Sequence, residues 1–296
     1  MQSNLEAKYG QQALAWHNVS TGAVSLWLLN DQNPSQVEGT MDLNWTCGPA
    51  CQNEWKVIDT APPADGVTNI LWHNKVSGDV SQWNIARDGS VTASGPLDWQ
   101  CSAATGCSQG WRPLGRMETS RPCSPTPCVT HRYENLVWHN AQSGEVSAWL
   151  LGGGNTVLEA QPFSFGCAAA TGCSQAWRAV GPLGRYGLLW HNASTGDLSV
   201  WKTGHNNEVT GTQNLSWTCG PDCAQQWKTI GQVEFDGKGG IDLGWHNIVT
   251  GEVAIWQLDT AGTVTGTSTL SFKCDSTCSQ TWKPIGFLRF PGAPPH

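Results

Sequence analysis

The chain has 296 residues, and its 16 lysines and arginines against 23 aspartates and glutamates give a formal net charge of −7. Because a negative protein repels polyanions, we expect no nucleic-acid partner and no attraction to an anionic membrane surface. No apolar run approaches the ~18 residues that cross a bilayer, so membrane insertion is not expected either. Glycine (34) and tryptophan (18) are abundant, a composition that suits short strands joined by tight turns.

One unit recurs five times along the chain. The tripeptide Trp-His-Asn returns at intervals of 56, 66, 52 and 55 residues, starting at Trp16, Trp72, Trp138, Trp190 and Trp245. Each copy continues with Thr/Ser-Gly, a second tryptophan, an aromatic residue before a cysteine pair, and a last tryptophan after that pair. These positions account for all 18 tryptophans, so the period is not an accident of composition. A fixed period of this kind indicates a repeat architecture.

The elements of one repeat can be followed in the second copy. Residues 70–73 form an apolar strand, residues 74–78 a turn rich in residues that tolerate the left-handed conformation, and residues 80–83 the returning strand of a hairpin. A third strand is predicted over 91–99 and a fourth over 111–114. Four strands per repeat, five times over, predict an all-β fold, a five-bladed β-propeller with four-stranded blades.

We expect a single propeller domain over 1–296. The predicted repeats span about 14–69, 70–135, 136–187, 188–242 and 243–296. Nothing before Trp16 matches the segment that begins at Trp282, so the last strand is expected to complete the first blade and close the ring. The extra length of the longest interval falls in a proline-rich inserted loop, 121–132.

The 12 cysteines form six close pairs. They are Cys47/Cys51, Cys101/Cys107, Cys123/Cys128, Cys167/Cys173, Cys219/Cys223 and Cys274/Cys278. An even number in local pairs predicts six small disulfide rings and an oxidising compartment, so the protein is expected to be secreted or periplasmic. The alternative is zinc ligation, which would require two pairs from different repeats to meet.

The pattern Leu/Ile-x-Trp-His-Asn-x-x-Thr/Ser-Gly-x-Val-x-x-Trp resembles the FG-GAP/VCBS-type propeller repeats of bacterial secreted proteins, over nearly the whole chain. The resemblance implies a propeller and, because small secreted propellers include lectins, a lectin-like function. In that family an Asp/Asn-rich loop commonly holds calcium. Only residues 234–242 keep a trace of such a loop, with Asp236 and Asp242 as candidate ligands and Lys238 where another oxygen would be wanted. We therefore expect no cofactor, with calcium at Asp236 and Asp242 as the alternative.

The repeated histidines are the first candidate site residues. The expected hairpin places each of them opposite a small residue, Ser25 for the first copy, and beside the second tryptophan. A His–Ser–Trp cluster is typical of a structural hydrogen-bond network, because buried polar groups must be satisfied. Contact with a ligand and a ring of metal-binding imidazoles are the alternatives. The five residues are His17, His73, His139, His191 and His246.

An amide two residues before the last tryptophan of every copy forms the second candidate site. Alternate residues of a strand share a face, so each amide is expected beside its tryptophan. The indole would hold the apolar face of a sugar ring while the amide bonds its hydroxyls; the alternative is that these tryptophans are core. The pairs are Asn53/Trp55, Gln109/Trp111, Gln175/Trp177, Gln225/Trp227 and Gln280/Trp282. The next residue is always cationic; we expect solvated strand positions here, with contact to an acidic sugar as the alternative. These residues are Lys56, Arg112, Arg178, Lys228 and Lys283.

Three functions follow from these patterns. The favoured one is a carbohydrate-binding protein with up to five weak sites used multivalently on glycans or glycoconjugates. A non-catalytic protein-interaction or adhesion module would use the rim and the 121–132 loop. An enzyme would have one site near the central channel and that insert, where Asp98, Glu118 and Glu134 are the unrepeated acids. No spacing of these acids indicates acid–base catalysis, so no catalytic residue and no metal ligand is assigned.

Overall fold

The computed structural model of the protein describes residues 11–30, 33–46, 54–61, 68–86, 88–99, 101, 110–121, 131–152, 156–167, 176–183, 187–204, 207–215, 220, 225–233, 235, 241–259, 263–274 and 278–290. Over these residues the elements are twenty strands and a single turn of helix, α6 (Cys278–Thr281). No helix in this part of the chain is long and apolar enough to cross a bilayer.

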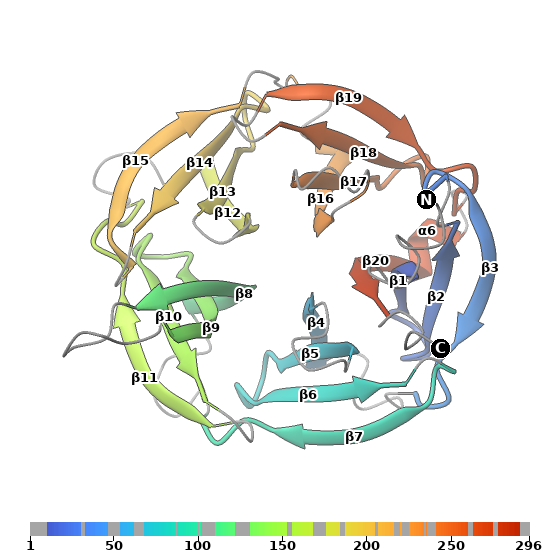
Figure 1. Ribbon diagram of the computed structural model, residues 1–296, viewed down its shortest axis with the longest axis horizontal. Helices are drawn as coiled ribbons and strands as arrows, with labels where there is room; N and C mark the ends of the chain where they lie inside the picture. The colour runs from blue at the N-terminus through green and yellow to red at the C-terminus, as the bar shows by residue number, and fades with distance from the viewer. Residues whose placement is uncertain are drawn as a thin grey trace.

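The strands form five four-stranded antiparallel sheets placed around a ring (Figure 1). From the centre outwards, the first blade is β20 (Trp282–Arg289), β1 (Gln12–Asn18), β2 (Val24–Leu29) and β3 (Val37–Asp42). The second is β4 (Trp55–Ala61), β5 (Thr68–Asn74), β6 (Val80–Ile85) and β7 (Val91–Pro96). The third is β8 (Trp111–Arg121), β9 (His131–Asn140), β10 (Val146–Leu151) and β11 (Val157–Pro162). The fourth is β12 (Trp177–Pro182), β13 (Gly187–Asn192), β14 (Leu198–Thr203) and β15 (Val209–Asn214). The fifth is β16 (Trp227–Val233), β17 (Asp242–Asn247), β18 (Val253–Leu258) and β19 (Val264–Thr269).

The ring is closed by pairing the last strand with the first. In the first blade, Trp282 of β20 lies opposite Asn18 of β1, and Arg289 lies opposite Gln12. The predicted five-bladed propeller, with its first blade completed by the C-terminal strand, is therefore confirmed.

The hydrophobic core lies between the blades. Strands β13 and β17 are buried along their whole length, whereas the outermost strands β15 and β19 alternate between half-buried and exposed residues. This difference follows from position, because the second strand of each blade is covered on both faces by neighbouring blades. One core cluster joins Ala13 and Val24 of the first blade to Ile70 and Trp72 of the second. Each blade is therefore stabilised chiefly by its neighbours.

Candidate ligand-binding site

The repeated Asn-x-x-Thr/Ser-Gly segment builds the same turn in every blade. In the third blade, Asn140 Oδ1 accepts hydrogen bonds from the backbone N–H groups of Gln142 (2.9 Å) and Ser143 (3.0 Å). Gly144 has a φ of 77°, a left-handed conformation that favours glycine. The Ser143 hydroxyl contacts Glu145 Oε2 at 2.9 Å. These residues shape the hairpin, which explains their repetition without any ligand.

The histidines do not lie opposite the serines. His17 pairs with Val24, and Trp16 pairs with Ser25, so the predicted His–Ser pairing is wrong by one residue. The cause is the turn, in which the Asn18 N–H donates to the Ala23 carbonyl and fixes the register. A shift of one residue moves a strand side chain to the other face of its sheet.

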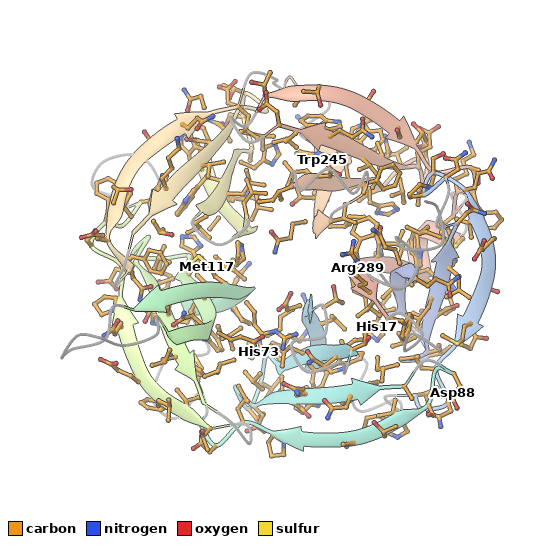
Figure 2. All side chains as sticks on the ribbon, in the orientation of Figure 1. His17, His73, Asp88, Met117, Trp245 and Arg289 are labelled. Carbon is orange, nitrogen blue, oxygen red and sulfur yellow. A yellow bond between two sulfur atoms is a disulfide. The ribbon has the colours of Figure 1, made fainter. Side chains whose placement is uncertain are left out.

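Each histidine instead contacts the Trp-His-Asn tryptophan of the next blade, edge to face. His17 and His73 lie at the junctions between the first and second and the second and third blades (Figure 2). The ring centroids are separated by 5.2 Å for His17–Trp72, 5.4 Å for His73–Trp138, 5.3 Å for His139–Trp190, 5.9 Å for His191–Trp245 and 5.5 Å for His246–Trp16. These five contacts form a closed circle through all five blades.

The histidines are buried and electrically neutral. Burial lowers the pKa of all five, to about 4 for His73, His139 and His246. A nearby cation adds to this effect at His139 through Arg112 and at His246 through Lys283. Over the described residues no group of three or more His, Cys, Asp and Glu side chains is placed to hold a metal ion. The geometry gives these histidines a packing role; their contact with a ligand stays a prediction.

The second predicted set lies at the start of the innermost strands. Each of its tryptophans is the first residue of a strand and is half-buried against a core cluster; they are Trp55, Trp111, Trp177, Trp227 and Trp282. Gln225 and Gln280 are exposed and helical, so the alternation of a strand does not place them beside their tryptophans. Asn53, Gln109 and Gln175 lie outside the described residues. Sugar binding by this set stays a prediction.

A different set of aromatic residues is exposed. These are the residues that precede the cysteine pairs, and their exposed fractions are 44% for Trp45, 45% for Trp99, 53% for Phe165 and 54% for Phe272. The repeat pattern showed them, but nothing in the sequence distinguished them from core aromatics. Trp217, the fifth member, lies outside the described residues.

Each exposed ring packs on a buried tryptophan of the next blade. The centroid separations are 4.1 Å for Trp45–Trp83, 5.7 Å for Trp99–Trp149, 5.2 Å for Phe165–Trp201 and 4.8 Å for Phe272–Trp27. The buried tryptophan in turn packs on the Trp-His-Asn tryptophan, as in Trp72–Trp83 at 4.4 Å. We call each such series, from histidine to exposed aromatic, an aromatic column, and its exposed ring a platform.

The platforms are anchored close to the hairpin turns. Trp99 lies two residues before Cys101, whose N–H donates to the Gly78 carbonyl in the turn of the second blade. Phe165 has the same relation to Cys167 and Gly144. The turns add exposed apolar side chains at Val19, Val76, Ile248 and Val249. Because exposed apolar groups that cluster mark interaction sites, this end of the blades is the best candidate for ligand contact.

Disulfides stiffen the same segments. Cys274 and Cys278 form a disulfide with a Cα–Cα separation of 5.2 Å, as predicted. Cys101 and Cys167 are also disulfide-bonded. The remaining cysteines, including the Cys123/Cys128 pair of the insert, lie outside the described residues.

An unrepeated ionic cluster joins the second and third blades. Asp59 stands at the strand bulge where the other four blades have glycine, and its Oδ2 accepts from the Arg116 backbone N–H (3.0 Å) and from Arg116 Nε (2.7 Å). Arg116 also bonds Asn69 Oδ1 and lies 3.8 Å from Glu134 Oε2. The Glu118 side chain is not among those described, and Asp98 accepts from the Val157 backbone N–H at 2.6 Å. Arg116 therefore pairs with Asp59 and Glu134, which is the arrangement of a structural ion pair.

Only one of the two candidate calcium ligands, Asp242, is among the described residues, and calcium binding at this loop stays a prediction. Asp242 is buried, and its two carboxylate oxygens accept backbone N–H groups from Phe235 (2.8 Å) and Leu258 (3.1 Å). Calcium requires six to eight oxygen ligands. Asp236 lies outside the described residues.

No protein-family model matches the chain, so the FG-GAP/VCBS resemblance is not confirmed. No curated protein matches it either. Among solved structures, the chain is similar to the structure of the Dos1 propeller, with 9% sequence identity and a TM-score of 0.34. The match covers 88% of this chain and 56% of the Dos1 chain. It is also similar to the dihydro-heme d1 dehydrogenase NirN in complex with DHE, with 10% sequence identity and a TM-score of 0.31. That match covers 90% of this chain and 47% of the NirN chain. A third similar structure is BBS1N in complex with ARL6DN, with 11% sequence identity and a TM-score of 0.30. That match covers 90% of this chain and 70% of the matched chain. The chain spans about half the length of the first two.

Proposed function

We propose that the protein is a secreted carbohydrate-binding protein that uses several equivalent weak sites at once. The observation that carries this proposal is the repetition of a platform, an exposed aromatic ring held on a buried tryptophan at the same place in four described blades. The propeller fold fits a binding role, and the disulfides fit an oxidising compartment.

Platform chemistry suits a sugar. The apolar C–H face of a pyranose ring packs on an aromatic face, while polar groups at the margin bond its hydroxyls. A ring that is already packed on a second ring and lies two residues from a disulfide loses little conformational freedom on binding. Weak sites that recur around a ring gain avidity on a surface that displays many copies of the glycan.

The innermost tryptophans give a second location for the same function. Trp111 and Trp177 are half-buried at the start of β8 and β12, so part of each side chain is open to a sugar. The two locations make different predictions, because the platforms lie between blades and the innermost tryptophans lie around the centre.

The test combines a glycan array with titration calorimetry on the oxidised protein. We expect several equivalent sites per chain, and we expect the double variant Trp45→Ala/Trp99→Ala to lose sites while still unfolding cooperatively. The variant Trp111→Ala/Trp177→Ala is the matched comparison; loss of sites only in that variant would move binding to the centre.

A protein-interaction role is the competing function, favoured by the apolar turn residues Val19, Val76, Ile248 and Val249. If the folded protein binds no glycan, the carbohydrate proposal fails, and these turn residues become the surface to examine for a protein partner.

A further inference from the structure

Positive charge is concentrated at the centre of this negative protein. The five innermost strands, β4, β8, β12, β16 and β20, carry eight of the 16 lysines and arginines but only two acids. The five outermost strands, β3, β7, β11, β15 and β19, carry three acids and no cation. The chain is negative as a whole, with a net charge of −7, but its innermost strands are positive.

Five of these cations occupy one equivalent position. Each is the second residue of its innermost strand and lies opposite the histidine of the neighbouring strand in the same blade. Because the pairing is the same in every blade and the five blades are placed around one ring (Figure 1), the five residues lie at one level and at one end of the ring. We call them the cation ring; they are Lys56, Arg112, Arg178, Lys228 and Lys283.

One neighbouring pair of the cation ring, Arg178 and Lys228, is close enough to interact. The pKa of Lys228 is lowered by burial and then by Arg178, which belongs to the adjacent blade. The pKa of His191 is lowered by burial and then by both of these cations. Like charges brought together in this way repel one another and reduce the stability of the fold.

Three of the five cations form no ion pair with the described carboxylates. They are Lys56, Arg112 and Arg178, whereas Arg116, outside the ring, pairs with Asp59 and Glu134. Those three ring side chains are exposed. Glu54 accepts from the Asn74 amide at 3.3 Å. Four blades also carry an acid after the turn glycine, and each of these acids contacts the Ser or Thr hydroxyl of its own turn at 2.6–3.0 Å; they are Asp79, Glu145, Asp197 and Glu252. An exposed positive ring in a field of negative charge attracts a compact anion.

We propose that the cation ring binds one multiply charged anion per chain, with closely spaced carboxylate, sulfate or phosphate groups, at the centre of the propeller. Three of its members are lysines and two are arginines, so the feature common to all five copies is charge and not a particular shape. The site is separate from the platforms and does not depend on their binding a sugar. Its stoichiometry is also different, since five residues around one axis meet one ligand.

The probes are sucrose octasulfate, a trimer of galacturonic acid and inorganic tripolyphosphate, with sucrose as the uncharged control. Titration calorimetry at ~20 mM salt should give one site per chain for at least one anion and none for sucrose, with an affinity that falls as salt is added. The three anions distinguish a sulfated sugar, a carboxylated sugar and a phosphorylated ligand as the source of the charge.

The decisive variant is Arg112→Gln/Arg178→Gln, which removes two neighbouring members of the cation ring. We expect it to weaken anion binding by about tenfold or more. Lys75→Gln/Lys202→Gln removes the same net charge from exposed positions outside the ring and should bind almost normally. Thermal unfolding of each variant provides the folding check, and the anion should raise the Tm of the wild type and of the Lys75/Lys202 control but not that of the ring variant.

Two results would overturn the proposal. The first is that no anion binds at low salt. The second is that the Arg112/Arg178 and Lys75/Lys202 double variants lose affinity equally, which would mean that anions respond to the overall charge and not to the cation ring. Trp45→Ala/Trp99→Ala should leave anion binding intact. Failure at the cation ring and failure at the platforms are thus separate outcomes.

Discussion

At the scale of single residues, the Trp-His-Asn motif divides into packing and turn functions. Trp138 is buried in the column, His139 packs edge-on against Trp190 of the next blade, and Asn140 caps the turn. The histidine has the most consequence for solution behaviour. Its Nε2 is buried and has no hydrogen-bond partner among the described residues, and the same holds for the Nε2 atoms of the other four histidines.

This burial makes stability depend on pH. The pKa of His139 is about 4 in the folded protein and about 6.5 when unfolded, so between these values the unfolded chain binds more protons. The free energy of unfolding should therefore not depend on these histidines above about pH 6.5. As pH falls from there toward 4, it should decrease by about 1.4 kcal/mol per pH unit for each histidine whose folded pKa is about 4.

Urea unfolding followed by tryptophan fluorescence at about pH 7.5 and about pH 5 measures this loss. His139→Gln should reduce the pH dependence by about one proton, because one titrating group is removed. An equal free energy of unfolding at the two pH values would contradict the assignment of buried, neutral histidines.

At the scale of elements, the aromatic column joins one blade to the next. At the junction of the first and second blades, His17 and Trp45 from one blade enclose Trp72 and Trp83 from the other. The hairpin of one blade is therefore held between two aromatic groups of its neighbour. The inner ring of such a column is fully buried, whereas its outer ring is half open to solvent.

The two ends of a column should respond differently to truncation. Trp138→Ala should cost about 3–5 kcal/mol, because it leaves a cavity between blades. Trp99→Ala, in the same column, should cost about 1 kcal/mol because part of its surface is already in water. Urea unfolding at neutral pH compares the two, and equal costs would show that Trp99 is structural and unsuited to bind a ligand.

At the scale of the whole molecule, stability depends on closing the ring. β20 is the innermost strand of the first blade and pairs with β1 along its length. It also places Phe287 and Leu288 in two different core clusters. The final strand thus completes the packing on both sides of the first blade.

Deletion of residues 282–296 should abolish cooperative folding, since it removes one strand of four from a blade that both its neighbours need. Deletion of 291–296 alone keeps β20 and is the matched control. Circular dichroism and thermal unfolding compare the two; a cooperative transition in the longer deletion would show that four intact blades are enough.

The sequence alone determined the architecture. Five copies of one hairpin pattern, with Trp16 and Trp245 in the same place of their copies, set the number of blades, and the unmatched segment from Trp282 predicted the closing strand. Local chemistry is sufficient for this, because turn residues and strand patterns act over a few neighbours and repetition multiplies their signal.

Only the tertiary structure decided which side chains contact each other across blades and which are exposed. The sequence placed His17 opposite Ser25, but a turn one residue different from the expected one directs it toward Trp72 of another blade. Trp45 and Trp72 are both tryptophans in the repeat, yet one is exposed and the other buried. Aromatic contacts between blades join residues at least 36 positions apart, and no local pattern encodes which aromatic side chain is on the outside. The sequence showed a cation after each last tryptophan, but only the fold places these residues, a whole repeat apart in sequence, at one level in space.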